Sequence, residues 1–581
     1  MIRSTAVALL LCLSVSAFAT PKGKAEFDLF ADELFNRYLA DNPTTATRLG
    51  VHLYDSRLED QSQKGIQRQA KWCHDELKQL AAFDRAKLTP EQQTDAELID
   101  GFLRAQLLEI EDVRMWQRNP DEYSSGISGS AFTIMSRNYA SQEDRLRSLV
   151  ERERQMPAVF VAARANLKNP PKIYTEIALE QLPGIESFFE SDVPAAFKDV
   201  KDEKLLQEFH EANSRVLTEL KSYGEFLKND LLPKSNGDFR IGASNYARKL
   251  QYEEMVDVPL PKLLEIARAD LARNQQEFIR IAKLIDPTKT PEQILQEAEQ
   301  DHPTGDGLLP AFRSTLEGER NFINTKHIVS IPSPVLPIIE ETPPFARALT
   351  SASMDTPGPW ENVAKEAYFN VTLPEKSWSD EQTRSWLEGF NRGTITSTSI
   401  HEAYPGHYVQ FLVLQVAPLT RARKIIGCGS NAEGWAHYTE QMMLDEGYGR
   451  TPGIPEEKDT AFQKLRLGQL QDALLRNARF VVGLQMHTGD MTFNEGVRFF
   501  ETQGRQTHQV ALRETERGTS DPTYLVYTVG KLEIMKLRED YKRKKGAEFS
   551  LQEFHDRFLR QGAPPVKIVR KALLGDDSPT L

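Results

Sequence analysis

Ile400-His401-Glu402-Ala403-Tyr404-Pro405-Gly406-His407-Tyr408-Val409-Gln410 is the stretch that decides the fold of this chain. It begins like the helical H-E-x-x-H signature, in which two imidazoles face one metal ion and the Glu polarises a water molecule. Pro405 stands where the second His belongs, and His407 lies about 240° around an ideal helix from His401. We therefore expect Pro405-Gly406 to break the helix and return His407 toward His401.

A second motif follows downstream, in Asn431-Ala432-Glu433-Gly434-Trp435-Ala436-His437-Tyr438-Thr439-Glu440. Its helical spacing predicts Glu433, His437 and Glu440 on one face. Two histidines and Glu433 would make a catalytic zinc site with three protein ligands, leaving the fourth position open. Glu440 or His437 is the alternative third ligand, although we expect both to orient ligands or face solvent instead.

Together the two motifs resemble the bacterial DUF885 family, which in turn resembles the helical zinc metallopeptidases of gluzincin type. The resemblance extends over most of the chain and includes Phe239-Arg240-Ile241-Gly242 with Tyr246, Arg476 and Arg479 leading to His487, and Tyr527-Thr528-Val529-Gly530-Lys531. It implies a mainly α, zincin-like fold with a small β-sheet beside the active-site helix.

The resemblance also implies a role for individual residues. Zn²⁺ would be held by His401, His407 and Glu433, and Glu402 would be the general base. Tyr527 would donate a hydrogen bond to the oxyanion, while the substrate-binding candidates are Asn370 and Arg476. For Tyr527 simple packing is an equal alternative, and Arg476 on a helix more often serves an internal ion pair.

Departures from the family lie on the substrate side of the site. Gly483 and Gln485 stand ahead of His487, where the family tends to have Asp and Gly. Before Tyr527 the chain reads Asp521-Pro522-Thr523-Tyr524 in place of a Pro-Gly-Gln-Ala-like run.

Helical patterns dominate residues 25–232 and recur beyond them, as in 262–284, where apolar residues are spaced by three and four. Thr89, Thr290 and Ser379 each precede a Gln by three residues, which predicts N-terminal capping boxes. The best strand candidates are 327–331 and 367–372, separated by a Pro-rich, irregular connection over 332–360. We predict a signal peptide at 1–19, an N-terminal helical lobe at 20–235 and a catalytic lobe at 236–581, and the two lobes can also form one continuous domain.

Composition excludes several classes of protein. The chain has 581 residues, 72 Lys+Arg against 84 Asp+Glu, a formal net charge of −12 and 40% hydrophobic residues. No apolar run beyond the first twenty residues is long enough to span a bilayer, and the acidity disfavours a nucleic-acid partner. Cys73 and Cys428 can pair or pack as separate buried thiols.

The N-terminus indicates export. A basic residue, an apolar stretch and Ala17-Phe18-Ala19 form a signal peptide that we expect to be cleaved after Ala19, giving a secreted or periplasmic protein. Three leucines precede Cys12, where a lipoprotein signal needs small residues, so we expect no lipid anchor.

Three functions are consistent with this sequence. The first is an exported zinc metallopeptidase that acts on peptides. The second is a non-catalytic periplasmic binding or scaffold protein, in which Pro405-Gly406 holds His407 away from His401. The third keeps the zinc but acts on esters or non-peptide amides of small molecules, since the same chemistry serves all acyl transfers. The sequence does not specify an oligomeric state.

Overall fold

The computed structural model describes residues 22–343, 347 and 350–581, so the predicted signal peptide lies outside the described residues. Helices make up most of the described chain, and its strands form one three-stranded sheet. The prediction of a mainly α fold is confirmed. None of the described helices is both long and apolar enough to cross a membrane.

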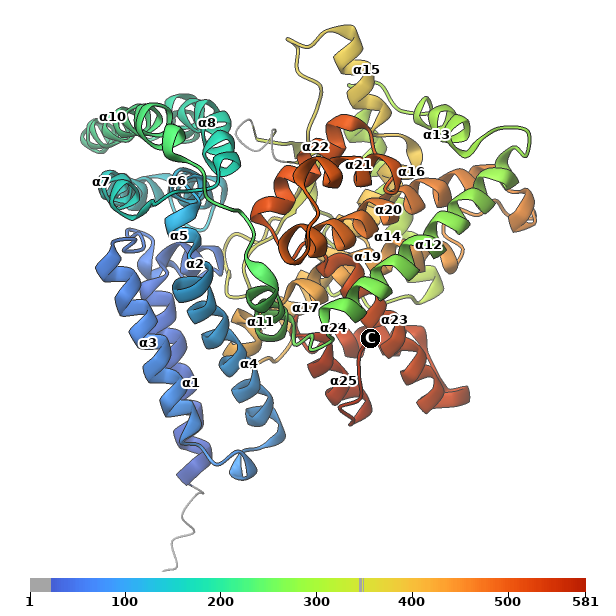
Figure 1. The fold of residues 1–581 in the computed structure, drawn as a ribbon, viewed down its shortest axis with the longest axis horizontal. Coiled ribbons are helices and arrows are strands. Elements are labelled where there is room, and N and C mark those ends of the chain that lie inside the picture. Colours follow the sequence, from blue (N-terminus) through green and yellow to red (C-terminus); the bar gives the residue numbers. More distant parts are fainter. Residues whose placement is uncertain (1–21, 344–346, 348–349) are drawn as a thin grey trace, which may run out of the picture.

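The N-terminal helices lie together on one side of the molecule (Figure 1), with one apolar core of their own and a second that also includes Ala422. They are α1 (Lys22–Asp41), α2 (Pro43–Arg48), α3 (Gln63–Ala81), α4 (Pro90–Leu107), α5 (Met115–Arg118), α6 (Asp121–Ser136), α7 (Gln142–Asn166), α8 (Lys172–Ser187), α9 (Val193–Ala196) and α10 (Glu203–Glu225).

The rest of the chain forms the larger side of the molecule in Figure 1, with α11 at the boundary. Its first helices are α11 (Gly242–Glu254), α12 (Leu260–Ile285), α13 (Pro291–Glu299) and α14 (Leu308–Lys326). After the sheet come α15 (Asp380–Glu388), α16 (Arg392–Glu402), α17 (His407–Val416), α18 (Arg421–Ile425), α19 (Gly429–Asp445), α20 (Thr460–Thr488), α21 (Phe493–Thr502), α22 (His508–Ser520), α23 (Val526–Lys545), α24 (Leu551–Leu559) and α25 (Val566–Leu574).

Local signals in the sequence place the helix starts correctly. Thr89, Thr290 and Ser379 all make the predicted capping boxes, each accepting a hydrogen bond from the main chain of the Gln three residues later. The amphipathic pattern over 262–284 lies within α12, whose apolar face is buried. The predicted boundary at residue 235 falls just after a short 3₁₀ turn, Leu232–Lys234.

The sheet is formed by β1 (Ile338–Glu341), β2 (Ala352–Asp355) and β3 (Tyr368–Val371) in the order β1-β3-β2. β1 pairs with β3 in parallel and β2 pairs with β3 antiparallel. One face of the sheet buries Ile339, Phe369 and Val371 in the same apolar core as residues of α14 and α16. The sheet thus lies beside the helix that carries His401.

The strand predictions were partly wrong. β3 lies inside the predicted strand 367–372, but 327–331 is not a strand. His327 ends α14 in the left-handed conformation with φ 53°, and Ser330 gives its main-chain N–H to the side chain of Asp556 rather than to a neighbouring strand. The connection 332–360, predicted to be irregular, contains β1 and β2.

Polar contacts join the N-terminal helices to the sheet region. His52 bridges two carboxylates, with Nδ1 2.9 Å from Asp55 and Nε2 2.8 Å from Glu361. Arg137 of the first lobe forms an ion pair with Asp355, the last residue of β2. The strand next to α16 is therefore tied to both halves of the molecule.

Two glycines let α19 and α23 cross at close range. A Cβ atom on Gly434 would lie 2.5 Å from Cα of Gly530, and a Cβ atom on Gly530 would lie 1.7 Å from the carbonyl oxygen of Ser430. Main chain, rather than a flexible side chain, fills both places. The distance between the two helices therefore requires glycine at both positions.

Gly530→Ala should lower the free energy of unfolding by at least about 2 kcal/mol, because the overpacking penalty outweighs the helix propensity that Ala adds. Denaturant unfolding measures the change. Gly129→Ala in α6 is the matched control, since a Cβ atom there meets nothing within 4 Å. It should be neutral or stabilise by about 0.4–1 kcal/mol. Equal stability of the two variants would contradict the close crossing.

Candidate metal centre

The helix that carries His401 is broken where the sequence predicts. α16 ends at Glu402 and α17 begins at His407, so the Pro405-Gly406 dipeptide lies between two helices. The N–H of Gly406 donates to the carbonyl of Ile400 at 2.9 Å, and a Cβ atom on Gly406 would lie 1.7 Å from the carbonyl oxygen of His401. Only glycine permits this tight return of the chain.

The second motif is held against this break by direct contacts. Trp435 is fully buried on α19, and its indole N–H donates to the carbonyl of Pro405 at 2.9 Å. At the start of α19 the carboxylate of Glu254 accepts from the N–H groups of Gly429 and Ser430, at 3.2 and 2.7 Å. An acidic group at a helix N-terminus is stabilising, so Glu254 anchors the helix that carries Glu433.

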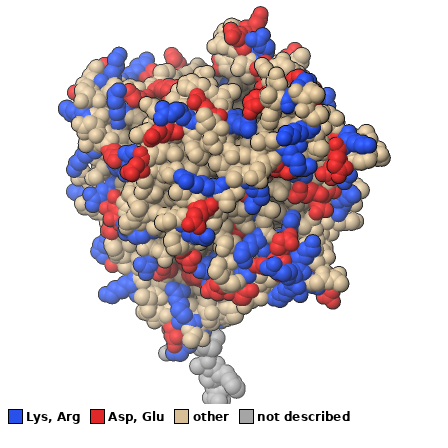
Figure 2. Space-filling view, turned by 45° about the vertical axis from the view of Figure 1, so that its right-hand side comes forward, with Lys and Arg blue, Asp and Glu red and all other residues tan. Residues whose placement is uncertain are grey.

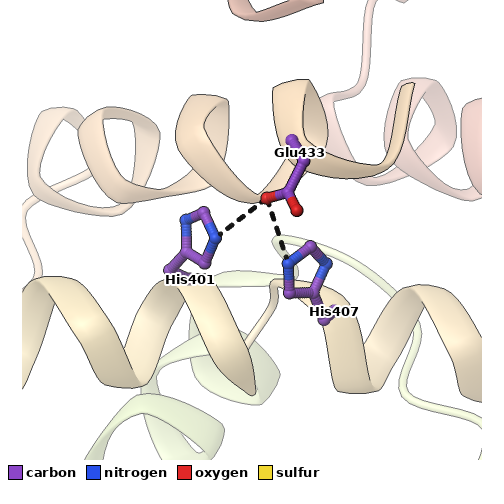
Figure 3. Close-up of side chains that lie close together, drawn as sticks. All are labelled: His401, His407 and Glu433. Carbon is purple, nitrogen blue, oxygen red and sulfur yellow. Dashed lines mark ion pairs between the residues drawn. The ribbon is translucent and has the colours of Figure 1, made fainter. Parts of the chain in front are cut away.

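His401, His407 and Glu433 converge from α16, α17 and α19 (Figure 3). Oε2 of Glu433 lies 3.3 Å from Nε2 of His401 and 3.4 Å from Nε2 of His407. One ligand atom from each of the three residues lies within 4.8 Å of the others, a group of the kind that can hold a metal ion. The bend at Pro405-Gly406 has brought the two imidazoles together.

The donor set fits a zinc ion. Ligand atoms about 2.0–2.2 Å from a tetrahedral ion lie about 3.3–3.5 Å from one another, which matches both distances from Glu433. Nδ1 of His401 is 2.7 Å from Glu440, so this carboxylate fixes the tautomer that presents Nε2 to an ion. Three protein ligands leave the fourth position open, as catalytic zinc sites do.

Glu440 lies behind the three candidate ligands and is completely buried. It contacts Nδ1 of His401, Nδ1 of His437 at 3.1 Å and the guanidinium of Arg476 at 3.0 Å. Burial alone would raise the pKa of Glu440, but the charge of Arg476 and the hydrogen bonds from His401 and His437 outweigh burial and hold the pKa well below its usual value. Glu440 is therefore an ionised carboxylate that orients His401.

The electrostatics around His401 follow from the same contacts. Burial lowers its pKa, yet the carboxylates of Glu433 and Glu440 more than compensate and raise the pKa to about 9. The two carboxylates thus favour the protonated imidazole in the metal-free protein, and metal binding would release that proton. His437 differs, because burial and the nearby Lys531 lower its pKa to about 3.

Glu402 and Tyr527 lie next to the three converging residues. Oε2 of Glu402 accepts a hydrogen bond from the main-chain N–H of Met354, on β2, at 3.1 Å. The ring of Tyr527 stacks on His401 with centroids 6.2 Å apart. Burial raises the pKa of Tyr527, and the negative charge of Glu433 raises it further. Glu402 thus faces β2, and Tyr527 packs against one of the converging histidines.

Of the two substrate-binding candidates, Arg476 borders the site, with Nη2 3.4 Å from Nδ1 of His401, and Asn370 lies further away. Arg476 forms an ion pair with Glu440, which is the alternative role expected from the sequence for an arginine on a helix. Asn370 is buried on β3, so β2 lies between its main chain and Glu402, and its Oδ1 has no hydrogen-bond partner among the described residues. Neither joins the group formed by His401, His407 and Glu433.

His487 and the two cysteines lie in the interior of the protein. His487 is buried, contacts the carbonyl of Gly518 at 2.7 Å, and packs against Phe239 and Tyr246. Burial lowers its pKa to about 4. Cys73 and Cys428 are free and buried, so they pack as separate thiols.

Comparison with known proteins identifies the family of this chain. Residues 43–573 match the family described as bacterial protein of unknown function, DUF885. The chain belongs to the DUF885 family. No match was found among curated proteins.

Solved structures share the fold over nearly the whole DUF885 chain. One is a candidate lipoprotein of unknown function from Shewanella oneidensis, with 27% identity and a TM-score of 0.77, covering 94% of this chain and 99% of the other. A second is a candidate lipoprotein from Colwellia psychrerythraea, with 16% identity and a TM-score of 0.79, covering 95% and 98%.

Some residues at this DUF885 site have no signal in the local sequence. Glu254 caps α19 from 175 positions away, and Met354 contacts Glu402 through its main chain from a segment that the sequence predicts to be irregular. Arg517 contacts the hydroxyl of Tyr527 from α22. Each contact depends on tertiary packing, so periodicity and motif spacing do not indicate it.

Glu440→Ala should lower the free energy of unfolding of the metal-free protein by about 3–5 kcal/mol, because it leaves the Arg476 guanidinium buried without its partner. Urea denaturation measures the loss. Adding Arg476→Ala should recover part of it, giving a coupling energy of about 0.5–3 kcal/mol. Glu539→Ala, which removes the exposed carboxylate that pairs with Arg538, is the control and should change stability by no more than about 0.5 kcal/mol. Additive effects of Glu440→Ala and Arg476→Ala would contradict the buried pair.

Proposed function

We propose that this protein is an exported, zinc-dependent hydrolase that cleaves peptides. The observation that carries the proposal is the convergence of His401, His407 and Glu433 beside Glu402. The fully buried Glu440 behind His401 supports it, because metal-binding histidines nearly always give their second N–H to a carboxylate, a carbonyl or water.

The chain supplies each residue that such a hydrolysis needs. Bound zinc would polarise the scissile carbonyl and make a water molecule more acidic. Glu402 would accept a proton from the attacking water and pass it to the leaving amine. Tyr527 would donate its phenolic proton in a hydrogen bond to the carbonyl oxygen as negative charge develops there, without itself being charged.

The edge of the sheet favours a peptide over other acyl substrates. The N–H of Met354 points to Glu402, away from β3, and alternate residues of an antiparallel strand point their main-chain groups to the same side. The main-chain groups of Ala352 and Met354 therefore face away from β3, on the side of Glu402, where the Ala352 carbonyl accepts a hydrogen bond from the Thr350 hydroxyl. An extended peptide can lie along such an edge as an added strand, which esters and small amides cannot do.

Export is supported by the family. Both solved structures are of candidate lipoproteins, which are exported proteins. The proposed cleavage after Ala19, the periplasmic location and the absence of a lipid at Cys12 concern residues outside the described ones. On the face shown in Figure 2, basic and acidic side chains are interspersed rather than gathered by sign, which does not favour a nucleic-acid partner there.

Zinc content tests the metal centre directly. Protein purified without a histidine tag should contain about one zinc per chain by elemental analysis, and His401→Ala should lose it. His508→Ala, which removes an exposed histidine of α22, should keep the zinc. Absence of zinc from the wild type after zinc is supplied would contradict the proposal and favour the binding or scaffold function.

Replacement of the general base tests the reaction. Glu402→Gln should reduce turnover of a peptide mixture, followed by mass spectrometry, by about 10²–10⁴-fold. Its zinc content should stay at the wild-type value, since Glu402 is not among the three converging residues. Glu381→Gln, at an exposed position of α15, should retain activity. Undiminished turnover in Glu402→Gln would refute this mechanism.

A further inference from the structure

Three guanidinium groups surround the ring of Tyr527. The Cζ atoms of Arg476, Arg479 and Arg517 lie 5.7, 4.9 and 6.0 Å from the ring centroid. Such a concentration of positive charge beside the candidate metal centre needs compensation, because like charges repel. The three arginines have different anionic partners, and these partners differ in how exposed they are.

Two of the arginines are neutralised by carboxylates that are fully or mostly buried. Arg476 pairs with the fully buried Glu440. Arg479 makes two hydrogen bonds to Glu514, Nε to Oε2 at 2.6 Å and Nη2 to Oε1 at 2.8 Å. A bidentate pair of this kind satisfies both partners and leaves little capacity for another anion.

Arg517 is different. Its side chain is 42% exposed, and its ionic partner Asp521, one turn further along, is 39% exposed. Nε and Nη2 of Arg517 both point to a single oxygen of Asp521, at 3.2 and 3.1 Å. Exposed pairs of this kind contribute only about 0–1 kcal/mol, so Arg517 can exchange Asp521 for a stronger anionic partner at little cost.

The position of Arg517 matches the reach of a short peptide. Its Nη2 lies 3.5 Å from the hydroxyl of Tyr527, whose ring stacks on His401. Two steps of about 6 Å, from His401 to Tyr527 and on to Arg517, place the guanidinium within about 12 Å of the His401 ring. An extended residue spans about 3.3–3.6 Å. At most about three extended residues therefore fit between the His401 ring, beside which the scissile bond would lie, and Arg517.

We propose that Arg517 binds the free C-terminal carboxylate of the substrate, so that the protein removes one to three residues from the C-termini of peptides. The planar guanidinium matches a carboxylate in shape and charge. This inference rests on the proposed peptidase function and names its substrate class. Arg517 is a specificity-determining residue, distinct from Glu402 and Tyr527.

Binding to an inactive protein tests the recognition without turnover. Zinc-loaded Glu402→Gln is titrated with N-acetyl-tetra-alanine, once as the free acid and once as the C-terminal amide, by calorimetry or NMR. The acid should bind at least ten times more tightly than the amide. Adding Arg517→Ala should remove the preference, while Arg517→Lys, which keeps the charge but lacks the fork, should retain part of it.

Arg513→Ala is the matched control, because Arg513 is exposed on the same helix. It should leave the acid-to-amide ratio unchanged. Equal binding of acid and amide, no binding of either, or an unchanged preference in Arg517→Ala would overturn the inference. If Arg517 acted only on Tyr527, its loss would weaken acid and amide equally.

The two proposals fail in different ways. A preference for the acid that depends on Arg517, combined with no hydrolysis by the zinc-loaded wild type, would overturn the peptidase function and retain the recognition. Hydrolysis of acid and amide substrates at the same rate by the wild type, with equal binding of both, would retain the peptidase and overturn the recognition.

Discussion

The interruption of one helix at Pro405-Gly406 is the constraint on which the rest of the site depends. In an unbroken helix His401 and His407 would lie about 240° apart around the axis, so the two imidazoles could not face one metal ion. The return of the chain requires glycine at 406, and Trp435 on α19 donates a hydrogen bond to Pro405 within the same turn. This hydrogen bond thus links the bend directly to the helix that carries Glu433.

Charge, rather than apolar packing, holds the residues behind the site. An isolated buried carboxylate is costly, and Glu440 is tolerated because Arg476 and two histidines surround it. Arg476 needs Glu440 for the same reason. The pair leaves His401 with a fixed ring orientation, and orientation is what a metal-binding imidazole requires from its surroundings.

Local physics explains which parts of this fold the sequence predicts. Thr89, Thr290 and Ser379 cap helices through residues three positions away, so their signals lie within a single turn. The spacing of His401 and His407 likewise indicates a broken helix. Strands depend on distant neighbours. Residues 327–331 have the composition of a strand, yet Ser330 donates its main-chain N–H to Asp556 rather than to a neighbouring strand. Arg517 and Glu254 reach the site through tertiary packing that no local pattern contains.

β2 connects the two halves of the molecule to the candidate centre. The main-chain N–H of Met354 contacts Glu402. The side chain of the next residue, Asp355, pairs with Arg137 of the N-terminal helices. Any displacement of those helices relative to α16 would have to stretch one of these two contacts. The N-terminal helices therefore help to fix the sheet edge beside the general base, although none of them contributes one of the three converging residues.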